Sequence, residues 1–121
     1  MAGKILVIED DEVNRKLFVS LLRERGYEVS EAADGQQAME RIEREAPSLI
    51  LMDIVLPKMS GLEVLRTCRA KGLLQRSKVY ALTASEIPEI DGAEFDGIIR
   101  KPVRVREFLH IIERMWEPGN P

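Results

Sequence analysis

The sequence predicts a doubly wound α/β domain, in which helices cover both faces of a five-stranded parallel sheet. Short apolar runs alternate along the chain with longer segments whose apolar residues recur at helical spacing, and this order is typical of such a sheet. One run, residues 48–52, is apolar almost throughout, as a central strand buried on both faces must be. Right-handed crossovers then favour the strand order 2-1-3-4-5.

The first half of the chain supplies three strands and two helices. The run Lys4–Ile8 predicts the first strand, and Gly26 is a natural C-cap for the helix that follows. The apolar stripe expected for that helix consists of Val13, Leu17 and Leu21, with Phe18 and Leu22 beside it. Residues 27–32 predict a weaker second strand, residues 36–45 a second helix, and residues 48–52 the third strand.

The second half continues the alternation. Ser60 can cap a third helix, residues 78–82 supply a fourth strand, and residues 97–99 form a short fifth one. The last helix carries an apolar stripe made of Val105, Phe108, Leu109, Ile112, Met115 and Trp116. We expect one domain over residues 1–117 and a disordered tail at residues 118–121.

Composition excludes several classes of protein. The 121 residues suit one domain, and 18 Lys+Arg against 21 Asp+Glu give a net charge of −3 with scattered basic residues, which argues against nucleic-acid binding. The single cysteine, Cys68, excludes an internal disulfide and a cysteine-based zinc site, and suits a reducing compartment. No apolar run reaches the length of a signal-peptide core or a membrane span. The expected location is therefore cytoplasmic, without a membrane partner.

Acidic residues stand where two neighbouring strands are expected to end. Glu9 and Asp10 follow the first strand, and Asp53 follows the third. Ligands of doubly wound sheets bind outside the carboxyl ends of the strands, so we expect these three carboxylates to converge there. Like charges held this close raise one another's proton affinity unless a cation neutralises them. An all-oxygen set of few carboxylates favours Mg²⁺.

Two further strand ends complement this cluster. Thr83 ends the fourth strand with a hydroxyl, and Lys101 follows the fifth with a positive charge. A metal, an ammonium group and a hydroxyl can together bind the oxygens of a phosphoryl group. A carboxylate can itself be the nucleophile and form an acyl phosphate.

Four segments carry a family resemblance. Residues 5–11, 49–63 and 81–84, together with the pair Lys101-Pro102, resemble the receiver domain of two-component response regulators, a flavodoxin-like fold. The resemblance covers essentially the whole chain. The opening Glu-Asp-Asp-Glu-Val-Asn is most similar to that of stand-alone, DivK-like regulators.

The resemblance implies a role for each strand-end residue. It implies that Asp53 is the phosphoacceptor, and that Mg²⁺ is held by Asp10, Asp53 and the backbone carbonyl of Val55, with Glu9 acting largely through water.

For the phosphoryl group, the resemblance implies that Thr83 binds one oxygen and that Lys101 forms an ion pair. The Lys101-Pro102 peptide bond is expected to be cis, which is uncommon for such bonds in general.

Partners also follow from the resemblance. The phosphoryl group would come from the phosphohistidine of a sensor histidine kinase or a histidine phosphotransfer protein. The output would be a contact with a downstream protein or onward phosphotransfer. The chain would then be a signalling protein that takes part in its own phosphorylation and dephosphorylation, rather than an enzyme acting on a separate substrate.

The sequence departs from the family pattern in two places. Ile98 stands where the family usually carries an aromatic residue that reports phosphorylation. The stretch between Thr83 and Lys101 is about one helical turn short, and Pro88 and Gly92 interrupt it. We therefore expect the fourth helix of the family to be absent or reduced to a turn, with a shortened helix beginning at Pro88 as the alternative.

Three other functions compete with this interpretation. A metal-dependent phosphatase of the haloacid-dehalogenase type would need an acid two residues after Asp53, where this chain has Val55. A mononucleotide or flavin module would need a Gly-rich loop after the first strand, where this chain is acidic. A non-phosphorylated adaptor with the same fold would not need the complete set of strand-end residues.

Overall fold

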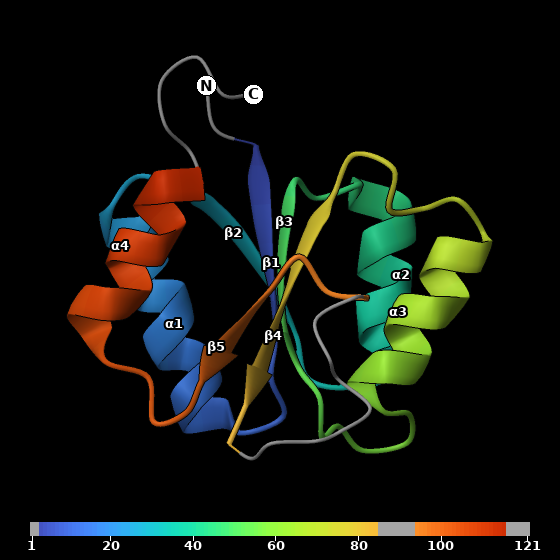
Figure 1. Cartoon of the computed structure of the whole chain (residues 1–121), viewed down its shortest axis with the longest axis horizontal. Coiled ribbons are helices and arrows are strands. Elements are labelled where there is room, and N and C mark those ends of the chain that lie inside the picture. The colour runs from blue at the N-terminus through green and yellow to red at the C-terminus, as the bar shows by residue number, and fades with distance from the viewer. Residues whose placement is uncertain (1–2, 85–93, 116–121) are drawn as a thin grey trace.

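The computed structural model describes residues 3–84 and 94–115, and it has the predicted architecture (Figure 1). Five parallel strands form one sheet in the order β2-β1-β3-β4-β5. The elements, in chain order, are β1 (Lys4–Ile8), α1 (Glu12–Glu24), β2 (Glu28–Ala32), α2 (Gly35–Glu45), β3 (Leu49–Asp53), α3 (Gly61–Ala70), β4 (Lys78–Thr83), β5 (Gly97–Arg100) and α4 (Val105–Met115). The predicted strand order is confirmed, and so is the order of the elements within the described residues.

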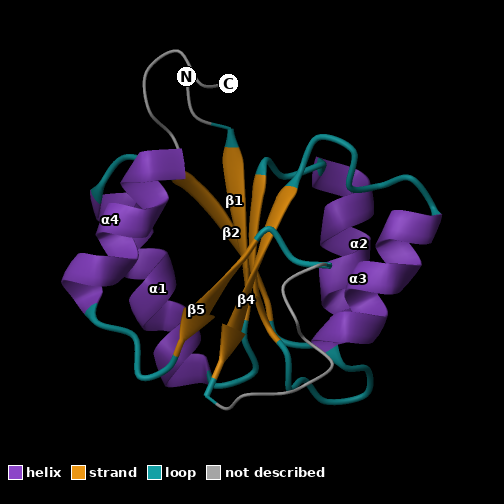
Figure 2. Cartoon of the chain, in the orientation of Figure 1, coloured by secondary structure: helices purple, strands orange, loops and turns teal. Residues whose placement is uncertain are grey.

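The helices pack in pairs on the two faces of the sheet (Figure 2). Helices α2 and α3 cover one face, where buried residues such as Ile42 and Leu65 pack against Ile50. Helices α1 and α4 cover the other face, where Phe18 and Phe108 approach with ring centroids 5.1 Å apart. Every residue of β3 is buried, so the central strand is enclosed from both sides as its apolar sequence predicts.

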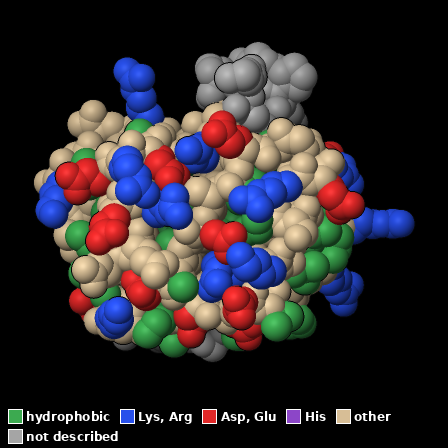
Figure 3. Space-filling view, turned by 180° about the vertical axis from the view of Figure 1, so that it is seen from behind, with side chains coloured by type: hydrophobic (Ala, Val, Ile, Leu, Met, Phe, Trp, Pro, Cys, Tyr) green, Lys and Arg blue, Asp and Glu red, His purple; other side chains and the backbone are tan. Residues whose placement is uncertain are grey.

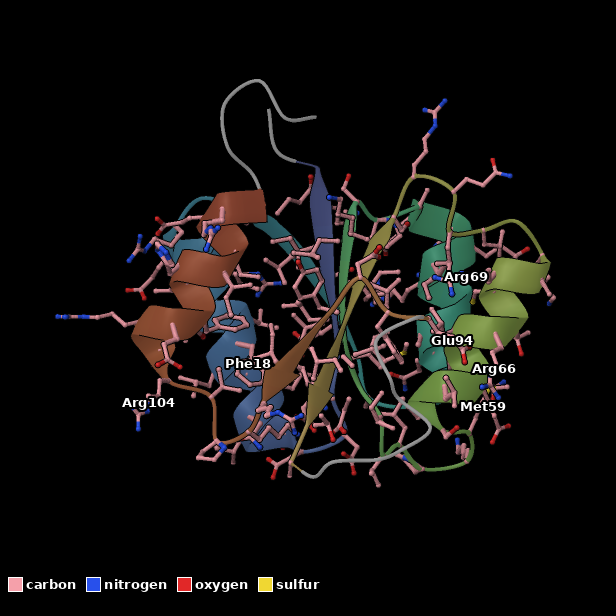
Figure 4. The ribbon with its side chains drawn as sticks, in the orientation of Figure 1. Phe18, Met59, Arg66, Arg69, Glu94 and Arg104 are labelled. Atoms are coloured by element: carbon pink, nitrogen blue, oxygen red, sulfur yellow. The ribbon has the colours of Figure 1, made fainter. Side chains whose placement is uncertain are left out.

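Helix α1 turns a different side toward the sheet than the stripe we expected. Phe18 and Leu22 are buried, but Val13 is 78% exposed and Leu17 is 47% exposed. Adjacent helix positions point about 100° apart, so placing Phe18 under α4 turns Leu17 outward. Figure 4 shows the Phe18 side chain between α1 and α4. Val105, at the first turn of α4, is also 44% exposed, so its assignment to the apolar stripe was wrong.

Local sequence signals fix the helix ends. The side chains of Asp11, Asp34 and Ser60 each accept a hydrogen bond from a backbone N–H of the following first turn, which satisfies donors that a helix start leaves unpaired. Gly26, just past α1, has φ +89°, a conformation that favours glycine. The predicted cap at Ser60 is therefore confirmed, whereas the C-cap of α1 is Arg25 and Gly26 directly follows it.

Some expectations fall outside the described residues. The absent or shortened fourth helix concerns residues 85–93, and the tail concerns residues 118–121. Among the helices that the structure does describe, none is both long and apolar enough to cross a membrane. On the face seen in Figure 3, acidic and basic side chains are interspersed, in keeping with the scattered charges of the sequence.

Candidate functional site

Four of the predicted site residues meet at the carboxyl ends of neighbouring strands. Glu9 directly follows β1, Asp53 is the last residue of β3 and Thr83 is the last residue of β4. Lys101 directly follows β5, and its backbone N–H donates to the Thr83 carbonyl oxygen at 2.8 Å. The parallel pairing of β1 with β3 and of β4 with β5 therefore brings residues far apart in sequence to one edge of the sheet.

A buried ion pair network occupies the centre of this edge. The Lys101 Nζ lies 2.7 Å from Glu9 Oε1 and 3.0 Å from Asp53 Oδ2. Glu9 is 1% exposed and Asp53 is 7% exposed, so both carboxylates lack the water that would ordinarily solvate them. Lys101 is thus the group that compensates two buried negative charges.

Backbone contacts fix the Asp53 side chain and the chain around it. Its Oδ1 accepts a hydrogen bond from the Val55 N–H at 3.0 Å, which leaves Oδ2 to Lys101. Behind it, the Gly61 N–H donates to the Ile54 carbonyl at 2.8 Å. A Cβ at Gly61 would lie 2.5 Å from the Asp53 carbonyl oxygen, so only glycine lets the start of α3 come this close to the acidic residue.

Burial and charge set the protonation of the network. Burial raises the pKa of Glu9 from 4.5 to about 7, the neighbouring Asp53 adds to the rise, and Lys101 opposes it. For Lys101, burial alone would lower the pKa. The hydrogen bonds and charges of Glu9 and Asp53 outweigh that effect and raise the Lys101 pKa above its ordinary value. The ammonium group therefore stays charged between the two acids.

Asp10 completes a group of three carboxyl residues that fits a hard divalent cation. One oxygen each from Glu9, Asp10 and Asp53 lies within 4.8 Å of the others, and Asp10 is exposed while the other two are buried. The side-chain donors are all carboxylate oxygens, the ligands that Mg²⁺ prefers. The donor set thus fits the expected metal, with its open side at Asp10.

Two predicted positions lie at the border of the site. Val55 is 70% exposed and contacts Asp53 through its N–H. Ile98 is partly buried and packs against the cluster beneath α2 and α3. The Lys101-Pro102 bond is cis, as expected.

Sequence reasoning missed two contacts of this site. It assigned Lys101 to the phosphoryl group and did not foresee its contact with Glu9. It also passed over Arg15 of α1, whose Nη1 donates to the Glu9 carbonyl oxygen at 2.9 Å. The available signal was an arginine on the first turns of the helix that follows the acidic pair.

Known proteins are similar to this chain in sequence and in fold. The profile of the response regulator receiver domain matches residues 5–113. The polar-differentiation response regulator DivK of Brucella anthropi is 34% identical over 117 residues, which cover 93% of this chain and 95% of that protein.

Solved structures agree with this assignment. The chemotaxis response regulator CheY4 of Vibrio cholerae has a TM-score of 0.85 at 26% identity, covering 94% of this chain and 98% of that one. The receiver domain of sensor histidine kinase PA1611 from Pseudomonas aeruginosa PAO1, with a magnesium ion coordinated in its active site cleft, has a TM-score of 0.80 at 32% identity and covers 94% and 97%.

Receiver domains are phosphoacceptor modules of two-component signalling, and they interact with histidine kinases and downstream targets. The strand order, the strand-end carboxylates and these similarities agree. The chain belongs to the response regulator receiver domain family.

Proposed function

We propose that this chain is a receiver, with its domain over residues 1–117, that accepts a phosphoryl group on Asp53 from a phosphohistidine. The donor would be a sensor histidine kinase or a histidine phosphotransfer protein. The observation that carries the proposal is the position of Lys101, whose Nζ contacts both Glu9 and Asp53 at the carboxyl end of the sheet.

The transfer requires a nucleophile that is ionised and held in place. An oxygen of the Asp53 carboxylate attacks phosphorus, and the new O–P bond forms as the P–N bond to the donor histidine breaks. The ring nitrogen that was bonded to phosphorus keeps the electron pair of the P–N bond. The other ring nitrogen carries the proton, so the histidine leaves as neutral imidazole. The Val55 N–H on Oδ1 and the Lys101 Nζ on Oδ2 orient the carboxylate for this attack.

Asp10, Asp53 and the Val55 carbonyl would hold Mg²⁺, with Glu9 contributing through water. When bound, the ion neutralises negative charge on the phosphoryl oxygens. Lys101 and the Thr83 hydroxyl would take up other oxygens of the same group. Hydrolysis would follow when water attacks the phosphorus, releasing inorganic phosphate and restoring the Asp53 carboxylate.

The acyl phosphate on Asp53 would carry roughly −1.5 to −2 charges next to Lys101 and Thr83, in place of the single negative charge of the carboxylate. Thr83 ends β4 and Lys101 directly follows β5, so a shift of either side chain would reach the surface next to those strands. The output would be a contact with a downstream protein or onward phosphotransfer.

Intact-protein mass spectrometry tests the proposal. The chain is incubated with a small acyl phosphate donor and Mg²⁺, and the same reaction is run with excess chelator. We expect a gain of one phosphoryl group that depends on Mg²⁺ and is lost in Asp53→Asn.

Asp11→Asn is the matched control, because Asp11 lies two residues from Glu9 and an Asn keeps its capping role on α1. It should gain the phosphoryl group like the unaltered chain. No gain in any variant, from small donors or from phosphohistidine proteins, would instead support the non-phosphorylated adaptor.

A further inference from the structure

The two backbone polar groups of Glu9 are both linked to the end of β2, the N–H directly and the carbonyl through Arg15. The Glu9 N–H donates to the Ala32 carbonyl oxygen at 3.1 Å. The Glu9 carbonyl accepts from Arg15 Nη1 at 2.9 Å, while Arg15 Nε donates to Glu31 Oε1 at 2.9 Å. Arg15 thereby joins three elements, because it lies on α1, Glu31 lies on β2 and Glu9 follows β1.

The arginine is itself held firmly. Its side chain is 12% exposed and that of Glu31 is 22% exposed, so neither end of the pair is free in solvent. Lys16 Nζ adds contacts of 3.0 and 3.1 Å to the two oxygens of Glu31. Burial alone would raise the pKa of Glu31, but hydrogen bonds from Lys16 and Arg15 lower it. This carboxylate therefore stays ionised and continues to bind Arg15.

The atom that Arg15 contacts belongs to the peptide that links two of the three carboxyl residues of the candidate metal site. The orientation of a peptide plane fixes the direction in which the next residue leaves it. Asp10 is exposed, so packing does little to hold its side chain. The Arg15 guanidinium can therefore fix the backbone position from which the Asp10 side chain extends. It does so without contacting a carboxylate oxygen of the metal site.

We propose that Arg15, clamped by Glu31, is a positioning residue for the metal site, which holds the Glu9–Asp10 peptide in the orientation that Mg²⁺ binding needs. This inference rests on the proposed function, because it presupposes a Mg²⁺ site at Glu9, Asp10 and Asp53. A planar fork with donors in fixed directions suits this bridge, and the single ammonium of a lysine cannot reproduce it. Partners of metal ligands commonly matter by about 10–100-fold in metal affinity.

Two effects of removing Arg15 have opposite signs, so the experiment separates them. Arg15→Met deletes a positive charge near the acidic group, and simple electrostatics then predicts tighter Mg²⁺ binding. Loss of the bridge predicts weaker binding. Titration calorimetry of the metal-free chain with Mg²⁺ is expected to show a Kd raised about 10-fold in Arg15→Met, and raised also in Arg15→Lys, which keeps the charge but not the fork.

A second measurement needs no metal. The Asp11 N–H donates to Glu9 Oε2 at 3.3 Å, and the Val55 N–H donates to Asp53 Oδ1. In the metal-free Arg15 variants, amide hydrogen exchange is expected to accelerate at Asp11 and to remain unchanged at Val55. A general loss of folding would accelerate both.

Arg41→Lys is the matched control. Arg41 pairs with Glu45 at 2.8 Å, and Glu45 also lies 3.7 Å from Lys4 at the opposite end of β1, so this exchange should leave the Mg²⁺ Kd unchanged. If Arg15→Met does not fold, Glu31→Ala removes the acceptor of Arg15 Nε while keeping the arginine, and the same faster exchange at the Asp11 amide is expected.

The outcomes distinguish the two proposals. If the unaltered chain does not bind Mg²⁺, the proposed function fails at its metal site. Unchanged or tighter binding in Arg15→Met, or normal binding in Arg15→Lys, overturns the positioning role and leaves the proposed function standing.

Discussion

Two sets of ion pairs in this chain differ in their surroundings more than in their geometry. At the strand ends, Lys101 contacts Glu9 and Asp53 at 2.7 and 3.0 Å, with both acids almost fully buried. On α3, Arg66 holds Glu94 through two hydrogen bonds of 2.8 and 2.7 Å at the surface (Figure 4). The surface fork lowers the pKa of Glu94, whereas burial raises the pKa of Glu9 to about 7 despite its contact with Lys101. Burial, more than geometry, makes an ion pair consequential.

Lys101→Met breaks the buried set and should have the largest effect. Without the ammonium group, two buried carboxylates face each other, and the free energy of unfolding at pH 8 should fall by about 3–5 kcal/mol in metal-free buffer. The loss should be smaller at pH 5, where Glu9, with a pKa of about 7, is protonated. Urea denaturation at both pH values measures it.

Lys58→Met is the control for this prediction. Lys58 Nζ lies 3.6 Å from Asp34 Oδ2 with a side chain that is 67% exposed, so its removal should cost little at either pH. Equal losses for the two variants would contradict the comparison between buried and exposed pairs.

Gly61→Ala disturbs the buried set without changing a charge. The new Cβ would lie 2.5 Å from the Asp53 carbonyl oxygen and 3.0 Å from the Ile54 Cα, so the start of α3 must move away from the acidic residue. We expect a loss of stability of about 1–3 kcal/mol and slower phosphorylation of Asp53. Denaturation and mass spectrometry report the two effects separately. Unaltered stability would show that the helix start can shift freely.

Glu9→Gln tests how the buried ion pairs make the stability of the chain depend on pH. The folded pKa of Glu9 lies above its ordinary 4.5, so the folded chain binds this proton more tightly than the unfolded chain. The resulting stability is complete below about pH 4.5 and is lost as the pH rises toward 7, by at most about 1.4 kcal/mol per pH unit.

Accordingly, the stability of the unaltered chain relative to Glu9→Gln should decline between pH 4.5 and 7 in metal-free buffer. Denaturation curves of the two chains at matched pH give the difference directly. A difference that stays flat across this range would show that Glu9 does not take up a proton there.

Arg66→Ala should have the smallest effect, because the Arg66 side chain is 59% exposed and water can replace it beside Glu94. Thermal midpoint, Mg²⁺ Kd and phosphorylation should all stay within experimental error. A marked change in any of them would give the fork a role that its exposure does not suggest.

The sequence anticipated the strand ends for a physical reason. A run that is apolar on both sides must lie in the middle of a parallel sheet, and the residue that ends it then lies at the ligand-binding edge, as Asp53 does. It did not anticipate which side of α1 faces the sheet. Val13 and Leu17 have the same spacing and character as Phe18 and Leu22, and only packing against α4 decides between them.

Contacts between distant elements were also beyond the sequence. Lys101 and Glu9, which form a hydrogen bond, are 92 positions apart in the sequence. The hydrogen bond from Arg15 to the Glu9 carbonyl depends on how α1 packs against β2. Local spacing does not encode either distance. Residue types at strand ends are thus predictable from the chain, whereas the side chains that hold them in place are found only from the folded structure.

The central claim is that Asp53 is the residue phosphorylated, and mapping the acyl phosphate tests it most directly. The phosphorylated chain is reduced with borohydride, which converts an aspartyl phosphate to homoserine, and is then digested and sequenced by mass spectrometry. The account predicts homoserine at position 53 alone, formed only when Mg²⁺ is present during phosphorylation. Homoserine at Asp10 or Asp11, or a phosphoryl group that borohydride does not remove, would contradict it.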